Sequence, residues 1–138
     1  MEQDLPLGAH LVTPRRGYCH HGIYVGSGTV VHYAGMHRLR LHGTVEETCI
    51  ADFARGRGYR VLNHATPAFS WEEIIKRARS RLGENRYSLM SNNCEHFAEW
   101  CISGKARSVQ IETFIQRLTS KLSKFARIFG HSLPQQQM

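Results

Sequence analysis

The stretch YCHHGIYVGSGTVVHY, residues 18–33, decides how the fold of this chain is interpreted. Its two halves are rich in aromatic and β-branched residues, which favour strands, and the short segment GSG at 26–28 separates them. Two such runs around a small glycine turn predict a β-hairpin. His20 and His32 then lie in the two arms of the hairpin. Because neighbours in a strand face opposite sides, spacing alone leaves open whether His20 or His21 faces His32.

Further strands and then helices are predicted on either side of the hairpin. Strands are expected at 9–13, ended by Pro14, and at 38–41 and 59–62, while 44–54 is interpreted as helix or loop. Ser70 and Glu73 form a capping box that begins a helix ended by Gly83. Apolar spacing predicts two more helices, over about 93–102 and over 111–129. Strands followed by helices indicate an α+β domain, an antiparallel β-sheet packed against helices.

Length and composition indicate one ordinary globular domain. The chain has 138 residues, of which 41% are hydrophobic and 21% charged. No apolar run is long enough to cross a bilayer, and the polar N-terminus does not resemble a secretory signal, so a cytoplasmic location is expected. The cysteines contain no C-x-x-C pair and are interpreted as free thiols, with Cys101 in the core; they are Cys19, Cys49, Cys94 and Cys101.

Positive charge is concentrated near the C-terminus. The formal net charge is +7, and residues 104–138 hold six basic residues against one acidic residue, Glu112. The 111–129 pattern has an apolar stripe with basic residues largely off it. Such a helix suits an anionic membrane surface, but it also suits packing on the protein's own core, and the sequence does not separate the two. Arg15, Arg16 and the arginines of 55–60 are interpreted as solvated loop charges, and nucleic-acid binding is not favoured.

Cys94 is the candidate nucleophile, within NNCEHF at 92–97, where a helix is expected to begin. The N-terminus of a helix and a nearby imidazole both lower the pKa of a thiol, and a second polar residue is needed to orient that imidazole. A lone cysteine at a helix start is more often a small buried residue. A zinc site of Cys94, His96, His20 and His32 is a further alternative, but the spacing matches no common zinc motif, so no metal or cofactor is expected.

Taken together, residues 18–26 (YCHHGIYVG), 31–33 (VHY) and 93–97 (NCEHF) resemble the lecithin:retinol acyltransferase-like family, which is known by its H-box and NC motifs. The resemblance covers about 8–103. It implies a circularly permuted papain-like (NlpC-type) fold, since both histidines precede the cysteine. By position it implies Cys94 as nucleophile, His20 rather than His21 as general base, and His32 as the orienting residue. Tyr18 and Asn93 are implied in binding the oxyanion or orienting the substrate.

The resemblance also implies a function and a division of the chain. Residues 1–104 would form a thiol acyltransferase or hydrolase domain, 105–130 a basic amphipathic helix, and 131–138 a flexible tail. The implied activity is that of an acyltransferase or phospholipase A-type hydrolase that forms a thioester on Cys94 from phospholipid or another acyl ester. Two alternatives stay open: a cysteine peptidase or amidase of the NlpC type, and a non-enzymatic interaction module that keeps the motif residues.

Overall fold

The structure, a computed structural model, describes residues 4–35 and 43–130. The chain divides into two compact units, Met1–Ser108 and Val109–Met138. The strand expected at 38–41 and the tail expected at 131–138 lie outside the described residues.

The first unit is built on a five-stranded sheet with the order β4-β3-β2-β1-β5, in which every pair of neighbours is antiparallel. The predicted hairpin is confirmed. Its turn places Ser27 at φ 51° and Gly28 at φ 68°, the left-handed pair that matches the twist of two antiparallel strands. The strands are β1 (His10–Arg15), β2 (Tyr18–Gly26), β3 (Thr29–Tyr33), β4 (Val45–Cys49) and β5 (Arg60–Leu62).

Two parts of the chain differ from the sequence-based expectation. Residues 44–54 form the edge strand β4 and then the short helix α1 (Ile50–Ala54), which Cys49 caps, instead of one helix or a loop. Pro14 does not end β1. The pairing of β5 with β1 stops at Val12, so the proline lies beyond that ladder and its missing N–H costs no bond to β5.

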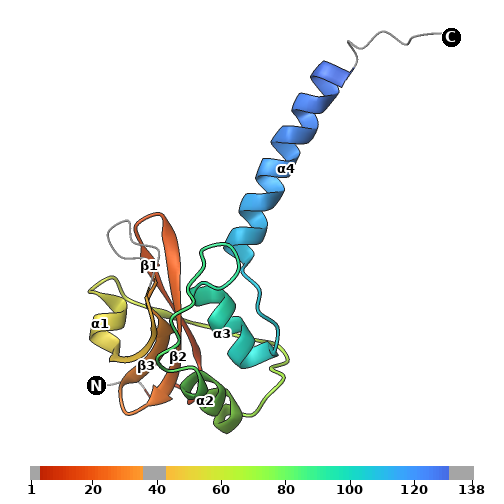
Figure 1. The fold of residues 1–138 in the computed structure, drawn as a ribbon. Helices are drawn as coiled ribbons and strands as arrows, with labels where there is room; N and C mark the ends of the chain where they lie inside the picture. The colour runs from red at the N-terminus through yellow and green to blue at the C-terminus, as the bar shows by residue number, and fades with distance from the viewer. Residues whose placement is uncertain (1–3, 36–42, 131–138) are drawn as a thin grey trace, which may run out of the picture. The chain divides into compact units, whose positions relative to one another are not determined.

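Helices cover both faces of the sheet (Figure 1). On one face lie α2 (Trp71–Ser80) and α3 (Cys94–Ser103), close to where the sequence predicts them, and Ser70 caps α2 by accepting the Glu73 N–H. On the other face lies α1 with its buried Phe53. The expected α+β class is therefore confirmed, whereas the circular permutation stays a prediction. The larger core, between the sheet and α2 and α3, contains Ile23, Val25, Val31, Tyr33, Ile74, Ala78, Phe97 and Cys101.

The described part of the second unit is one helix, α4 (Val109–Gly130), which contains the predicted 111–129 and begins two residues before it. Most of its large apolar side chains with described burial are exposed by 45% to 72%, and no other described element of that unit covers them. None of the helices within the described residues has the length and hydropathy to span a bilayer. The exposed stripe contains Phe114, Ile115, Leu118, Leu122 and Ile128.

Candidate active site

His20 and His32 form a bonded pair on the α1 face of the sheet. The register places Gly22 opposite His32, so His20 is the diagonal neighbour of His32 on the same face. His20 Nε2 lies 2.7 Å from His32 Nδ1, and the two rings meet edge to face at 5.0 Å. His21 faces the other side of the sheet. The alternation of the strand therefore pairs His20, and not His21, with His32.

Phe53 and Glu46 contact the two histidine rings. The Phe53 ring of α1 lies 5.4 Å from the His20 ring and 5.9 Å from the His32 ring. Glu46 Oε1 of β4 lies 3.2 Å from His32 Nε2, without the alignment of a hydrogen bond. Sequence reasoning missed both residues: it did not recognise β4, which carries Glu46, and it did not place the helix that carries Phe53 on the sheet. The sequence of Val45–Cys49 has no alternation of buried and exposed residues that could have identified Glu46, which reaches His32 only because β4 pairs with β3.

Cys94 is the first residue of α3, and the residues around it fix the start of that helix. Asn93 Oδ1 accepts the N–H groups of Glu95 and His96, and Asn93 Nδ2 donates to the Leu89 carbonyl. In return, His96 Nδ1 accepts the Asn93 N–H, which closes a capping box. The structure thus engages Asn93 in capping, whereas the resemblance implied an orienting role. His96 is engaged in the same cap, which disfavours the zinc alternative.

The sulfur of Cys94 meets β2 at the peptide groups that flank His20. Sγ lies 4.0 Å from the Cys19 carbonyl oxygen, and the backbone N–H of His21 donates toward the sulfur. The ladder between β2 and β3 starts only at Gly22, so these groups lie past the end of β3. Helix α3 packs on the face opposite the histidine pair. The Cys94 sulfur therefore contacts the backbone of β2, at the peptide groups on either side of His20.

Burial sets the protonation of both candidate groups. It raises the pKa of the Cys94 thiol to about 11, although the backbone N–H groups of His21, Glu95 and Cys94 itself act in the other direction. The helix start does lower the pKa of Cys94, as expected, but burial outweighs it and the net pKa is raised. Burial, followed by the neighbouring His32 and Arg15, holds the pKa of His20 well below its usual value. The resting pair is a thiol and a neutral imidazole, the combination in which the imidazole acts as general base.

Arg15 is buried, so its interpretation as a solvated charge is wrong. It ends β1 opposite Tyr18, and its Nη2 donates to the Phe53 carbonyl at 2.6 Å. Its Nη1 is buried and has no hydrogen-bond partner among the described residues. Burial raises the pKa of Tyr18, and a charge on Cys94 raises it further, which indicates that these two side chains are close.

A cavity of about 170 Å³ opens onto this group of side chains. It combines two cationic groups, the histidine pair, a phenol and one carboxylate. Such a cavity can accept a substrate that carries negative charge next to the reacting carbonyl. The polar residues of its wall are Arg15, Tyr18, His20, His32, Glu46 and Arg55.

Comparison with known proteins gives a consistent result. A family model described as lecithin retinol acyltransferase matches residues 3–107. The chain is 36% identical over 122 residues to human phospholipase A and acyltransferase 2, covering 76% of this chain and 75% of that protein. It is 31% identical over 135 residues to rat lecithin retinol acyltransferase, covering 78% of this chain and 58% of that protein. It is also 32% identical over 114 residues to human phospholipase A and acyltransferase 4, covering 71% of this chain and 70% of that protein. The chain thus spans three quarters of the first relative and less than three fifths of the second.

Proposed function

The chain belongs to the lecithin retinol acyltransferase family, which confirms the resemblance seen in the sequence, and we propose that it acts on lipid acyl esters through a cysteine thioester. The names of the relatives support an acyltransferase or phospholipase A activity and an acyl-ester substrate. Two contacts carry the proposal. His20 Nε2 lies 2.7 Å from His32 Nδ1, and Cys94 Sγ lies 4.0 Å from the carbonyl oxygen of Cys19, the residue before His20.

The proton positions in this site are consistent with general-base catalysis. With its Nε2–H donated to His32 Nδ1, His20 presents an unprotonated Nδ1. The remaining proton of His32, on Nε2, faces Glu46. As Cys94 Sγ attacks the ester carbonyl, the thiol proton passes to His20 Nδ1 and a tetrahedral oxyanion forms. The imidazolium then returns that proton to the departing alcohol oxygen, and the acyl group stays on sulfur as a thioester.

The second half of the reaction reuses the same groups. Water, or an alcohol or amine acceptor, loses a proton to His20 as it attacks the thioester, and the Cys94 thiol is regenerated. Water as acceptor makes the reaction a hydrolysis, and an alcohol or amine makes it a transfer. In each half, Tyr18 and the Cys94 backbone N–H are proposed to donate to the oxyanion.

We further propose that Arg15 and Arg55 bind the phosphate of a phospholipid donor. Both side chains line the cavity of the histidine pair, and Arg15 Nη1 is buried there without a hydrogen-bond partner among the described residues. Guanidinium groups suit phosphate oxygens in number and direction of donors. A phosphate held at this point would place the neighbouring acyl ester close to His20.

Donor selectivity tests this proposal. Turnover is measured with a phosphatidylcholine dispersed in detergent, with a nitrophenyl acyl ester that has no phosphate, and with an acylated dipeptide. Cys94→Ala should abolish turnover, while Cys49→Ser, at an exposed cysteine, should not change it. Arg55→Asn should lower kcat/KM for the phospholipid about tenfold and leave the nitrophenyl ester unaffected; Arg16→Gln is the matched control.

Two results would contradict the proposed activity, and a third would contradict only the phosphate site. Turnover of the dipeptide alone would favour the peptidase alternative. An absence of turnover with every donor would favour the non-enzymatic module. An equal loss on both esters in Arg55→Asn would refute the phosphate site without touching the thiol mechanism.

For α4 we propose binding to an anionic membrane surface. The exposed apolar stripe and the basic residues Arg117, Lys121, Lys124 and Arg127 suit the headgroup region of a bilayer. Each basic residue near such a surface contributes about 1 kcal/mol. Sedimentation with vesicles that contain phosphatidylserine should pellet the protein at low salt, and Leu118→Ser/Leu122→Ser should reduce the pelleted fraction. Binding that is insensitive to both salt and these substitutions would refute the proposal. The cytoplasmic location stays a prediction.

A further inference from the structure

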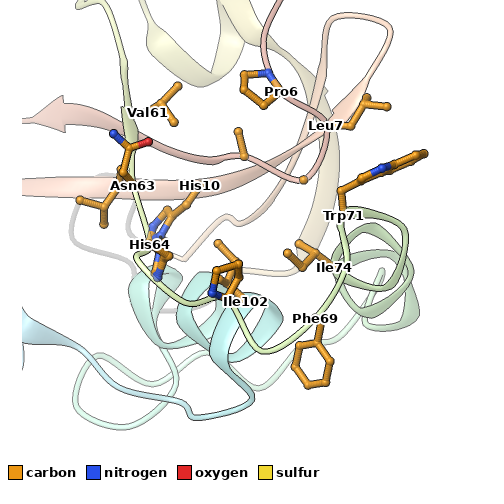
Figure 2. Close-up of a pocket in the computed structure, with 14 residues that line it drawn as sticks. Pro6, Leu7, His10, Val61, Asn63, His64, Phe69, Trp71, Ile74 and Ile102 are labelled. Atoms are coloured by element: carbon orange, nitrogen blue, oxygen red, sulfur yellow. Dashed lines mark hydrogen bonds between the residues drawn. The ribbon is translucent and has the colours of Figure 1, made fainter.

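A second group of histidines lies on the opposite face of the sheet from the His20–His32 pair. His10 of β1 is at its centre, with a side chain that is not exposed at all. His10 Nδ1 lies 2.9 Å from Nε2 of His64, which follows β5, and His10 Nε2 lies 2.7 Å from Nδ1 of His21. Figure 2 shows the His10 and His64 side chains next to each other in the wall of a pocket.

Glu99 of α3 brings a carboxylate to the same point. Its Oε1 lies 3.8 Å from His64 Nε2 and 3.9 Å from His10 Nδ1. The three side chains each offer one ligand atom, and these atoms lie within 4.8 Å of one another. Two imidazoles and one carboxylate from three different elements are a ligand set that Zn²⁺ uses when one position is left open.

The distances require only small movements to hold a cation. Ligand atoms at about 2.0–2.2 Å from a tetrahedral ion are about 3.3–3.5 Å from one another. The two imidazoles would separate by about 0.5 Å from their 2.9 Å contact, and the carboxylate would approach by a similar amount. His64 and Glu99 have side chains exposed by 20% and 12%, so both have room to adjust.

The residues on the Nε2 side of His10 favour the tautomer in which His10 Nδ1 is unprotonated and can bind a metal. If His10 Nε2–H donates to His21 Nδ1, then His21 Nε2–H faces Glu95 Oε2, which is 3.7 Å away. Glu95 Oε1 in turn accepts the hydroxyl of the buried Ser108. This arrangement leaves a lone pair on His10 Nδ1, directed at His64 and Glu99. A histidine that donates its other N–H to an acceptor is the usual support of a metal ligand.

The pocket supplies the open position. His10 and His64 line a cavity of about 270 Å³ whose other walls are largely apolar and include Val61, Phe69 and Ile102. Its lining shares no residue with that of the cavity at His20 and His32. An ion bound by His10, His64 and Glu99 would therefore lie at the wall of an apolar pocket that is separate from the cavity at His20 and His32.

We propose that His10 Nδ1, His64 Nε2 and Glu99 Oε1 bind a divalent cation that favours imidazole and carboxylate ligands, with Zn²⁺ as the leading candidate. The ion would join β1, the segment after β5 and the middle of α3, whose first residue is Cys94. The fourth ligand would be water or an anionic group in the pocket. Sequence spacing does not reveal this site, because its ligands are separated by 54 and 35 positions.

Titration of the full chain, stripped of metal with a chelator, tests the proposal. Zn²⁺ binding is followed by calorimetry, and Co²⁺ binding by its visible absorption, which reports both geometry and the presence of a sulfur ligand. We expect one Zn²⁺ per chain, a Co²⁺ spectrum without a sulfur-to-metal band, and a melting temperature that rises by several degrees at about 100 times Kd.

The variants locate the ion. His64→Gln and Glu99→Gln should each weaken Zn²⁺ binding at least tenfold, and their metal-free melting temperatures show whether they fold as the unchanged chain does. Cys94→Ala and His32→Gln, in the other site, should retain the ion with unchanged affinity. Equal Zn²⁺ affinity in His64→Gln, Glu99→Gln and the unchanged chain would overturn the proposal. So would loss of the ion in Cys94→Ala, or binding of the unchanged chain weaker than about 1 mM.

Discussion

Adding one methyl group at Gly22 should lower kcat more than the loss of stability explains, because the methyl group would displace a side chain that positions the histidine pair. A Cβ on Gly22 would lie 2.6 Å from Val30 Cγ1 and 2.9 Å from Phe53 Cε2. Carbon atoms at rest are about 3.5–4.0 Å apart, so Gly22→Ala requires shifts of about 1 Å. Val30 is fully buried, and the Phe53 ring is the one that packs against His20 and His32.

Two effects of this substitution can be estimated. Inserting a carbon into a packed core costs about 1–3 kcal/mol, which the reduced freedom of the unfolded chain offsets by about 0.4–1 kcal/mol. We therefore expect the free energy of unfolding to fall by about 1–2 kcal/mol. Displacing Phe53 moves the histidine pair, and an error of about 1 Å in a catalytic group lowers kcat up to about 100-fold.

Gly17→Ala is the matched control. Gly17 has φ 83°, where alanine is strained, but a Cβ there meets no atom within 4 Å. It should lose about 1–2 kcal/mol of stability while keeping kcat. Urea unfolding followed by tryptophan fluorescence gives stability, and turnover of the phospholipid gives kcat. Adding Val30→Ala to Gly22→Ala should restore part of both losses. Equal kcat values for Gly22→Ala and Gly17→Ala would refute the argument that Phe53 positions the pair.

Four further predictions concern the protonation of His20, the protonation of Cys94, the orientation of His32 and the cap of α3. Because burial lowers the pKa of His20, its neutral form persists as pH falls, so kcat/KM should stay level from about pH 8 to about pH 6; a decline centred near the usual histidine pKa of about 6.5 would contradict this. Alkylation of Cys94 should rise with pH toward its pKa of about 11, measured by iodoacetamide labelling of His20→Ala, and a midpoint near 8.5 would contradict the burial argument. Glu46 is 52% exposed, so Glu46→Gln should lower kcat by less than about fivefold, whereas His32→Gln should lower it by about 10–100-fold; equal losses would show that Glu46 does more than assist His32. Asn93→Ala should cost about 0.5–2 kcal/mol by removing the cap of α3, and Asn93→Asp should cost less; an unchanged melting temperature in Asn93→Ala would show that the cap is dispensable.

Local sequence patterns predicted the elements that depend on local interactions. The hairpin follows from two β-prone runs around residues 26–28, and α2 follows from the Ser70 cap and its apolar spacing. By contrast, β4 has only Val45 buried and its other residues exposed or intermediate, so its strand state depends on pairing with β3. Pro14 stays in β1 because the pairing with β5 stops at Val12, which the sequence does not show.

The site shows the same division between local and tertiary information. The family resemblance implied His20, His32 and Cys94, spacing alone could not choose between His20 and His21, and the register explains why His20 is the partner of His32. Burial could not be read from sequence, and it reverses two expectations: Arg15 is inside the protein, and the pKa of Cys94 is raised. Glu46, Phe53 and the group around His10 come from distant segments that only the folded sheet brings together.

The central claim is that Cys94 and His20 act as nucleophile and general base, and the rate at which Cys94 is acylated tests it most directly. The protein is mixed with a short-chain phosphatidylcholine, quenched in acid at intervals, and digested for mass spectrometry. We predict an acyl group on the peptide that contains Cys94, none in Cys94→Ser, and acylation slowed about 10²–10⁴-fold in His20→Asn. Acylation of another residue, or an unchanged rate in His20→Asn, would contradict the account.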